Sequence, residues 1–117
     1  MKKLLIIEDD GDTLEMLGYA AESPNIEVVL KSQTPTIEEI QQLDPNLILV
    51  DHWLGDGYGG NLCRQIKSNP LTRRVPVVIM SAMTNVKKIA SDSGADGSLS
   101  KPFDINEVTG IFKTYLG

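Results

Sequence analysis

Short apolar runs alternate regularly along this chain with segments of helical spacing, and few folds accommodate such a pattern. Four runs are almost continuously apolar, at residues 4–7, 26–30, 47–50 and 75–80, and a weaker fifth lies near Leu99. A strand that is apolar on both of its sides suits a parallel sheet covered on both faces. The sequence therefore predicts five parallel strands.

Segments with helical periodicity follow each of these runs, with apolar residues three and four positions apart. The pattern predicts an α/β protein with a doubly wound (βα)5 chain, in which helices cover both faces of one sheet. An acidic residue three positions after a capping residue predicts a capping box, a reciprocal pair of hydrogen bonds at a helix start. Three pairs have this spacing: Asp12 with Glu15, Thr36 with Glu39 and Asp104 with Glu107.

Length and composition predict one domain over residues 1–117, with no effector domain in this chain. The single cysteine, Cys63, cannot form an intramolecular disulfide, and the apolar stretch near the N-terminus is too short for a signal peptide. No apolar run approaches the roughly 20 residues that a membrane helix needs. We therefore expect a cytoplasmic protein that does not cross or bind a membrane.

The chain is acidic, with a formal net charge of −5 and a pI near 4.7. Binding to nucleic acid or to an anionic membrane requires clustered lysine and arginine. The composition therefore predicts no direct contact with nucleic acid, and it favours proteins or small ligands as partners.

Polar residues stand at the ends of four of the predicted strands. In an open parallel sheet, ligands bind beyond the carboxyl ends of the strands, so these side chains should gather at one edge. They are Glu8, Asp9 and Asp10 after the first strand, Asp51 after the third, Ser81 after the fourth and Lys101 after the fifth.

Each of these residues has an ordinary explanation when it is considered alone. The acidic run can cap a helix, Asp51 can begin a polar loop, Ser81 can cap a helix, and Lys101 can be a solvated residue at a strand end. Together they favour a site, because three carboxylates from two strands repel one another unless a cation lies among them. Oxygen ligands of this kind are those that Mg²⁺ prefers.

Four segments, in order along the whole chain, resemble the receiver domain of two-component response regulators. They are "LLIIEDD", "LILVDHWLGDGYGG", "VVIMSA" and "GADGSLSKPF", and each ends or follows a predicted strand. The resemblance implies a flavodoxin-like fold with the strand order 2-1-3-4-5. It also implies that a histidine kinase or a histidine phosphotransfer protein donates a phosphoryl group and that a downstream effector protein responds.

The resemblance assigns a role to each motif residue. Asp51 would be the phosphoacceptor, and Glu8, Asp9, Asp51 and the backbone carbonyl of Trp53 would hold Mg²⁺. Ser81, the amide of Ala82 and Lys101 would bind the phosphoryl oxygens, so Asp51, Ser81 and Lys101 would carry the transfer. Beyond weak self-phosphorylation and self-dephosphorylation, we expect no enzymatic activity.

Two positions and the length of one segment depart from the family pattern. Gly55 stands where proline is usual, which predicts a more mobile loop after Asp51. The stretch from Ser81 to Lys101 is tight and predicts a shortened fourth helix or preceding loop. Ser98 occupies the position of the usual aromatic switch residue, so signalling through an aromatic rotamer is not expected there.

Two other functions are compatible with a fold of this kind. A receiver fold can serve as a protein-interaction module without phosphorylation, although such a module would commonly lose one of the motif residues. A small flavodoxin-like electron carrier is disfavoured, because the acidic first loop would repel a flavin phosphate. The only histidine, His52, is interpreted as a solvated loop residue rather than a ligand.

Overall fold

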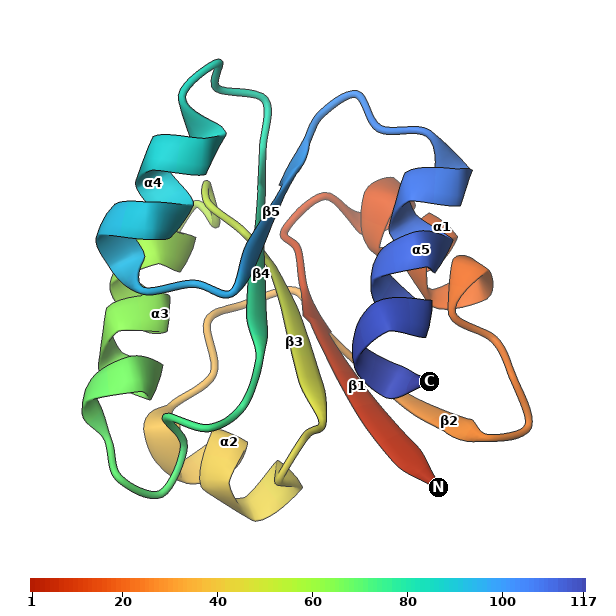
Figure 1. The fold of residues 1–117 in the computed structure, drawn as a ribbon, viewed down its shortest axis with the longest axis horizontal. Helices are drawn as coiled ribbons and strands as arrows, with labels where there is room; N and C mark the ends of the chain where they lie inside the picture. The colour runs from red at the N-terminus through yellow and green to blue at the C-terminus, as the bar shows by residue number, and fades with distance from the viewer.

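The computed structural model describes residues 1–117 and contains five strands that alternate with five helices (Figure 1). All neighbouring strands are parallel, in the order β2-β1-β3-β4-β5. The expected fold and strand order are confirmed. The elements are β1 (Lys2–Ile7), α1 (Gly11–Ala20), β2 (Ile26–Lys31), α2 (Ile37–Leu43), β3 (Leu47–Asp51), α3 (Gly59–Ser68), β4 (Val77–Ser81), α4 (Val86–Ser93), β5 (Gly97–Ser100) and α5 (Ile105–Leu116).

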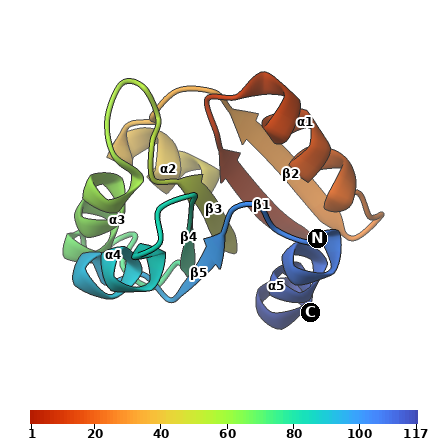
Figure 2. The same cartoon turned by 90° about the horizontal axis from the view of Figure 1, so that it is seen from above.

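Helices cover both faces of the sheet, with α1 and α5 on one face and α2, α3 and α4 on the other (Figure 2). Each face has its own apolar core. Alternate residues of the central strands enter opposite cores, so Leu5 and Val50 pack under α2, α3 and α4, whereas Ile6 and Leu49 pack under α1 and α5. Burying one such side chain stabilises the fold by about 1.5–3 kcal/mol.

Two of the three predicted capping boxes are present, at Thr36 with Glu39 and at Asp104 with Glu107. The third prediction is wrong, because Asp12 lies inside the first turn of α1. The N-cap is Asp10, whose extended backbone lets its carboxylate accept a hydrogen bond from the amide of Thr13 at 3.0 Å. The chain therefore enters α1 directly from the acidic run.

Element bounds differ from the predicted ones by one or two residues. β4 begins at Val77 rather than at residue 75, and Asp51 and Ser81 are the last residues of their strands rather than the first residues after them. Helix α4 has eight residues, and α5 is the longest helix with 12. None of the five helices has the length and apolar character that crossing a membrane requires.

Candidate functional site

The polar residues singled out by the sequence meet at the carboxyl end of the sheet. Glu8 follows β1, Asp51 ends β3, Ser81 ends β4 and Lys101 follows β5. The strand order makes β1 and β4 the two neighbours of β3, so these residues lie side by side. The amide of Lys101 donates to the carbonyl of Ser81 at 2.9 Å, which attaches the end of β5 to the end of β4.

Lys101 forms the electrostatic centre of this site. Its Nζ lies 2.8 Å from Oε2 of Glu8 and 3.0 Å from Oδ1 of Asp51. The Glu8 side chain is 1% exposed and that of Lys101 only 23%, so the pair is largely removed from water. Buried charges of this kind require a partner. Lys101 is therefore part of the site and not a solvated residue at a strand end.

Burial raises the pKa of both carboxyls, and the hydrogen bonds from Lys101 only partly offset this effect. For Glu8, the Asp51 charge raises the pKa further. Burial lowers the pKa of Lys101, but its bonds to Glu8 and Asp51 outweigh burial and hold the pKa above its ordinary value. The lysine therefore remains charged, while the two acids carry more negative charge than one lysine neutralises.

Carboxylate oxygens of Glu8, Asp9 and Asp51 lie within 4.8 Å of one another. Glu8 and Asp51 are buried, whereas Asp9 is exposed at the opening of the site. Three carboxylates facing one lysine leave an excess of negative charge that a divalent cation would neutralise. The oxygen donor set fits Mg²⁺, which is bound through one or two carboxylates together with waters and phosphate oxygens.

Ser81 and Ala82 form the side of the site at the end of β4. Ser81 is 5% exposed, and its Oγ accepts a hydrogen bond from the amide of Met83 at 3.0 Å. This bond fixes the turn after the strand and leaves the hydroxyl hydrogen free to be donated. Ala82 follows on the exposed surface. The site thus combines acceptors, a cation and a hydroxyl donor in one place.

A family model described as the response regulator receiver domain matches residues 4–113. The chain belongs to this family. Among its relatives, response regulator ArlR of Staphylococcus saprophyticus is 33% identical over 119 residues, which cover 99% of this chain and 53% of that protein. The chain spans about half the length of the curated relatives it matches.

Solved structures have the same fold as this receiver domain. The signal receiver domain of a DNA-binding response regulator from Colwellia psychrerythraea has a TM-score of 0.88 and 26% identity, and the match covers 99% of this chain and 98% of that one. The receiver domain of sensor histidine kinase PA1611 from Pseudomonas aeruginosa has a TM-score of 0.85 and 22% identity with the same coverage. That structure has a magnesium ion coordinated in its active-site cleft.

In this receiver domain, the loop after the predicted acceptor lies against the residues that follow β1 and β2. Gly55 has φ +77°, a left-handed conformation that proline cannot adopt, and a Cβ there would lie 3.3 Å from Oδ2 of Asp9. Asp56 accepts hydrogen bonds from the amide and hydroxyl of Thr34 at 3.2 and 2.8 Å. Glycine therefore brings the loop close to Asp9, and Asp56 attaches it to the segment after β2. Trp53 is 62% exposed in this loop.

His52 has a structural role that sequence reasoning missed. It is half-buried, its carbonyl accepts from the amide of Gly59 at 2.7 Å, and its Nδ1 accepts from the amide of Gly60 at 3.2 Å. Burial lowers its pKa, which favours the neutral ring that can accept a hydrogen bond. It caps α3 in place of Tyr58, whose side chain makes no capping bond. The only signal in the sequence was the lack of a capping residue before Gly59.

Ser98 is half-buried in the middle of β5, where its partner in β4 is Ile79. Its side chain carries no ring, so the position cannot supply an aromatic rotamer switch. The structure brings together Glu8, Asp9, Asp51 and Lys101 and places Ser81 at the end of the strand beside Asp51, whereas Ser98 departs from the expected aromatic residue.

Proposed function

We propose that this receiver domain accepts a phosphoryl group on Asp51. The observation that carries the proposal is the placement of a buried aspartate between a lysine at 3.0 Å and an acidic cluster that can hold a divalent cation. Neither the lysine nor the acidic cluster alone would suffice, because phosphoryl transfer requires both a positioned nucleophile and neutralisation of the phosphoryl oxygens.

In the proposed reaction, a carboxylate oxygen of Asp51 attacks phosphorus. A new P–O bond forms as the P–N bond of a phosphohistidine breaks, and the electron pair leaves with the imidazole, which takes up a proton. Lys101 would exchange one of its carboxylate contacts for a phosphoryl oxygen. The hydroxyl of Ser81 and the amide of Ala82 would donate to the remaining oxygens.

Glu8, Asp9, Asp51 and the backbone carbonyl of Trp53 would hold Mg²⁺ in this proposal. The ion would supply positive charge next to the acceptor and the phosphoryl group. Support comes from the carboxylate cluster and from the magnesium-bound receiver domain of PA1611. Gly55 also supports it, because the glycine keeps the loop backbone close to Asp9.

The phosphoryl donor would be a histidine kinase or a histidine phosphotransfer protein, and a downstream effector protein would respond to the phosphorylated form. Direct contact of this domain with nucleic acid is not proposed, given its net charge of −5. We also propose that catalysis is limited to weak self-phosphorylation and self-dephosphorylation.

Phosphorylation would signal mainly through the segment from Met83 to Lys87, which comprises the loop after Ala82 and the first two residues of α4. The hydroxyl of Ser81 already contacts the amide of Met83, so its reorientation toward a phosphoryl group would act on this loop first. The N-cap of α4, Asn85, makes no side-chain capping bond, so the start of α4 lacks one stabilising contact. Hydrogen exchange with a stable phosphoryl mimic should show protection here; selective protection around β5 would contradict this route.

Incubation with acetyl phosphate and Mg²⁺, followed by intact-mass measurement, tests the proposal. We expect one phosphoryl adduct, and we expect Asp51→Asn to abolish it. Asp56→Asn is the matched control, because Asp56 lies in the same loop but is exposed and bonded to Thr34. An adduct of equal yield in the Asp51 variant would assign the wrong acceptor. A complete lack of adduct in the parent protein would favour the phosphorylation-independent interaction module.

A further inference from the structure

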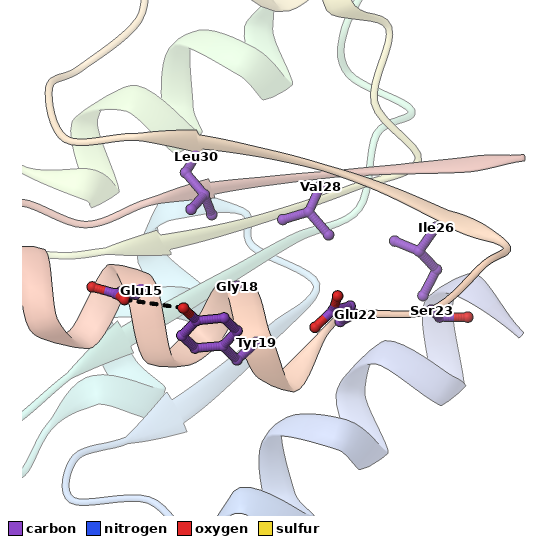
Figure 3. Close-up of a pocket in the computed structure, with 8 residues that line it drawn as sticks. All are labelled: Glu15, Gly18, Tyr19, Glu22, Ser23, Ile26, Val28 and Leu30. Carbon is purple, nitrogen blue, oxygen red and sulfur yellow. Dashed lines mark hydrogen bonds between the residues drawn. The ribbon is translucent and has the colours of Figure 1, made fainter.

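A groove of about 430 Å³ lies between α1 and the edge strand β2, and none of its lining residues belongs to the phosphoacceptor site. Ile26, Val28 and Leu30 point from β2 toward α1 and form its apolar floor (Figure 3). Gly18 forms the nearest part of α1, and a Cβ there would lie 3.2 Å from Cδ1 of Leu30. Because position 18 has no side chain, the backbone of α1 can lie this close to Leu30, which sets the depth of the groove at this end.

The rim of the groove is acidic. Glu15 lies on the exposed side of α1 and Glu22 is exposed just after the end of that helix, and neither forms an ion pair with a lysine or arginine. Between them, Tyr19 is 67% exposed, and its hydroxyl donates to Oε1 of Glu15 at 3.2 Å (Figure 3). The rim thus offers two carboxylates without a cationic partner beside an apolar floor.

The floor is only partly covered because the two faces of the sheet carry different numbers of helices. On the face of α2, α3 and α4, the β2 residue Val29 packs against the apolar core together with Ile37 and Leu43. On the other face only α1 and α5 are present, and Leu30 remains 42% exposed. One more helix beside α1 would complete this layer over β2.

The charge of this region points to the chemistry of the missing helix. The residues that line the groove include two carboxylates, Glu15 and Glu22, and no lysine or arginine. Lys31 is directed to the opposite face, where its Nζ lies 3.7 Å from Glu39. Within β1 and β2, the register places one cation on the groove side, Lys2 at the Ile26 end. A ligand that covers the groove would therefore meet an almost uniformly negative rim.

We propose that this groove binds a basic amphipathic helix of a partner protein. Apolar side chains at positions i, i+3, i+4 and i+7 of that helix would lie on Ile26, Val28 and Leu30, and its lysine or arginine side chains would pair with Glu15 and Glu22. An added β-strand would not fill the groove, because it would extend β2 at the sheet edge rather than cover the face of the strand. Binding does not depend on phosphorylation of Asp51.

A labelled synthetic peptide of about 18 residues, with leucines at helical spacing and flanking lysines, tests the proposal by fluorescence anisotropy. Two control peptides accompany it: one has the same composition with its leucines scrambled to remove the apolar face, and one has glutamate in place of lysine. We expect binding only of the first peptide, with an affinity that falls as the salt concentration rises. Equal binding of the scrambled peptide would overturn the proposal.

Variants of the whole chain locate the binding surface. Glu15→Lys combined with Glu22→Lys, and separately Leu30→Ser, should each weaken binding at least tenfold. The matched controls are Glu27→Lys, an exposed acid on the opposite side of β2, and Leu71→Ser, an exposed leucine elsewhere. Both controls should bind as the parent does. Equal losses in the groove and control variants would show nonspecific attraction to an acidic protein and overturn the assignment.

Two further measurements distinguish this proposal from the phosphoacceptor proposal and from self-association of the chain. Asp51→Asn should bind the peptide as tightly as the parent, so failure of the phosphoacceptor proposal leaves this one intact. Sedimentation equilibrium of the chain alone should show a monomer at the concentrations used for binding. Self-association that Leu30→Ser abolishes would assign the groove to a second copy of this chain and overturn the proposal of a basic partner helix.

Discussion

The carboxyl end of the sheet and the groove on β2 depart from ordinary packing in opposite ways. At the carboxyl end, Glu8 and Asp51 are charged groups held out of water, and Lys101 from the same chain contacts both. At the groove, Val28 and Leu30 are apolar side chains left partly in water, because α1 covers them only in part.

The two regions differ in whether the same chain or another molecule supplies the group that compensates the buried charge or covers the exposed apolar surface. Burying a charge without a partner costs several kcal/mol, so a folded chain must supply that partner itself. Exposing one or two apolar side chains costs far less, so a chain can leave them uncovered. The site is therefore already organised in the isolated domain, whereas the groove is completed only by another molecule.

The largest expected effect distinguishes covered from uncovered leucines on one face of the sheet. Leu49→Ala should lower the free energy of unfolding by about 2–5 kcal/mol, because Leu49 is fully buried under α1 and α5. Leu30→Ala, on the same face, should cost about 1 kcal/mol or less. Urea denaturation measures both free energies of unfolding, and m-values that do not change show that the variants can be compared. Similar losses for the two variants would mean that the groove is not an open surface.

The next effect tests whether the charge at the carboxyl end is balanced from within. Lys101→Met should lower the free energy of unfolding by about 1–3 kcal/mol, because it leaves Glu8 and Asp51 without their cation. Lys88→Met is the matched control, since Lys88 forms an exposed pair with Asp92, and it should change stability by about 0.5 kcal/mol or less.

Adding Asp51→Asn to the Lys101 variant should recover part of the lost stability, because one unpaired charge is then removed. Equal effects of the Lys101 and Lys88 substitutions would argue that the site is solvated and its charges need no compensation.

A smaller effect is expected from Mg²⁺. At a free concentration ten times its dissociation constant, the ion should stabilise the protein by about 1.4 kcal/mol, and EDTA should reverse the change. Emission from Trp53, the only tryptophan, should report the same saturation because the residue lies in the loop beside Asp51. Glu8→Gln with Asp9→Asn should remove both responses.

Asp44→Asn is the control for this measurement, because Asp44 is exposed at the C-cap of α2 and its positive φ tolerates asparagine. A response to Mg²⁺ that persists in the Glu8 and Asp9 variant would place the metal elsewhere.

The smallest predicted effect is a dependence of stability on pH in metal-free protein. Burial raises the folded-state pKa of Glu8 and Asp51, so the folded protein binds protons more readily than the unfolded chain. The stability that Glu8 and Asp51 contribute is fully present below their ordinary pKa values near 4. It is lost as pH rises through their raised folded-state pKa values. Unfolding free energy in EDTA should therefore increase as pH falls from about 7 toward 4.5.

Other carboxyls act in the opposite direction and at lower pH. Hydrogen bonds lower the pKa of Asp10, Glu39 and Asp56, so the stability that they contribute is lost as pH falls below about 4. A variant with Glu8→Gln and Asp51→Asn should keep this acid loss and lack the gain between pH 7 and 4.5. The measurement is the urea midpoint as a function of pH for parent and variant. If the two curves superimpose, burial does not perturb the pKa values of Glu8 and Asp51.

Much of the fold and of the candidate site could be predicted from the sequence because the signals are local. Continuous apolar runs identify strands buried on both sides, and the carboxyl end of a parallel sheet gathers whatever residues follow those runs. Glu8, Asp51, Ser81 and Lys101 were found in this way. The cap at Asp10 was missed because Asp12 also has the spacing of a capping box, and spacing alone does not tell where the backbone turns into the helix.

By itself the sequence determined which segments are strands and helices and which polar residues reach one edge of the sheet, since both follow from periodicity and the direction of the strands. The folded structure was needed to show that Lys101 contacts Glu8 from 93 positions away, that His52 caps α3, and that one face of β2 is only partly covered. The Lys101 contact depends on strand order, the exposure of β2 depends on how many helices cover each face, and the His52 cap depends on how the loop between β3 and α3 folds back. None of these is encoded in the spacing of residues within a single element.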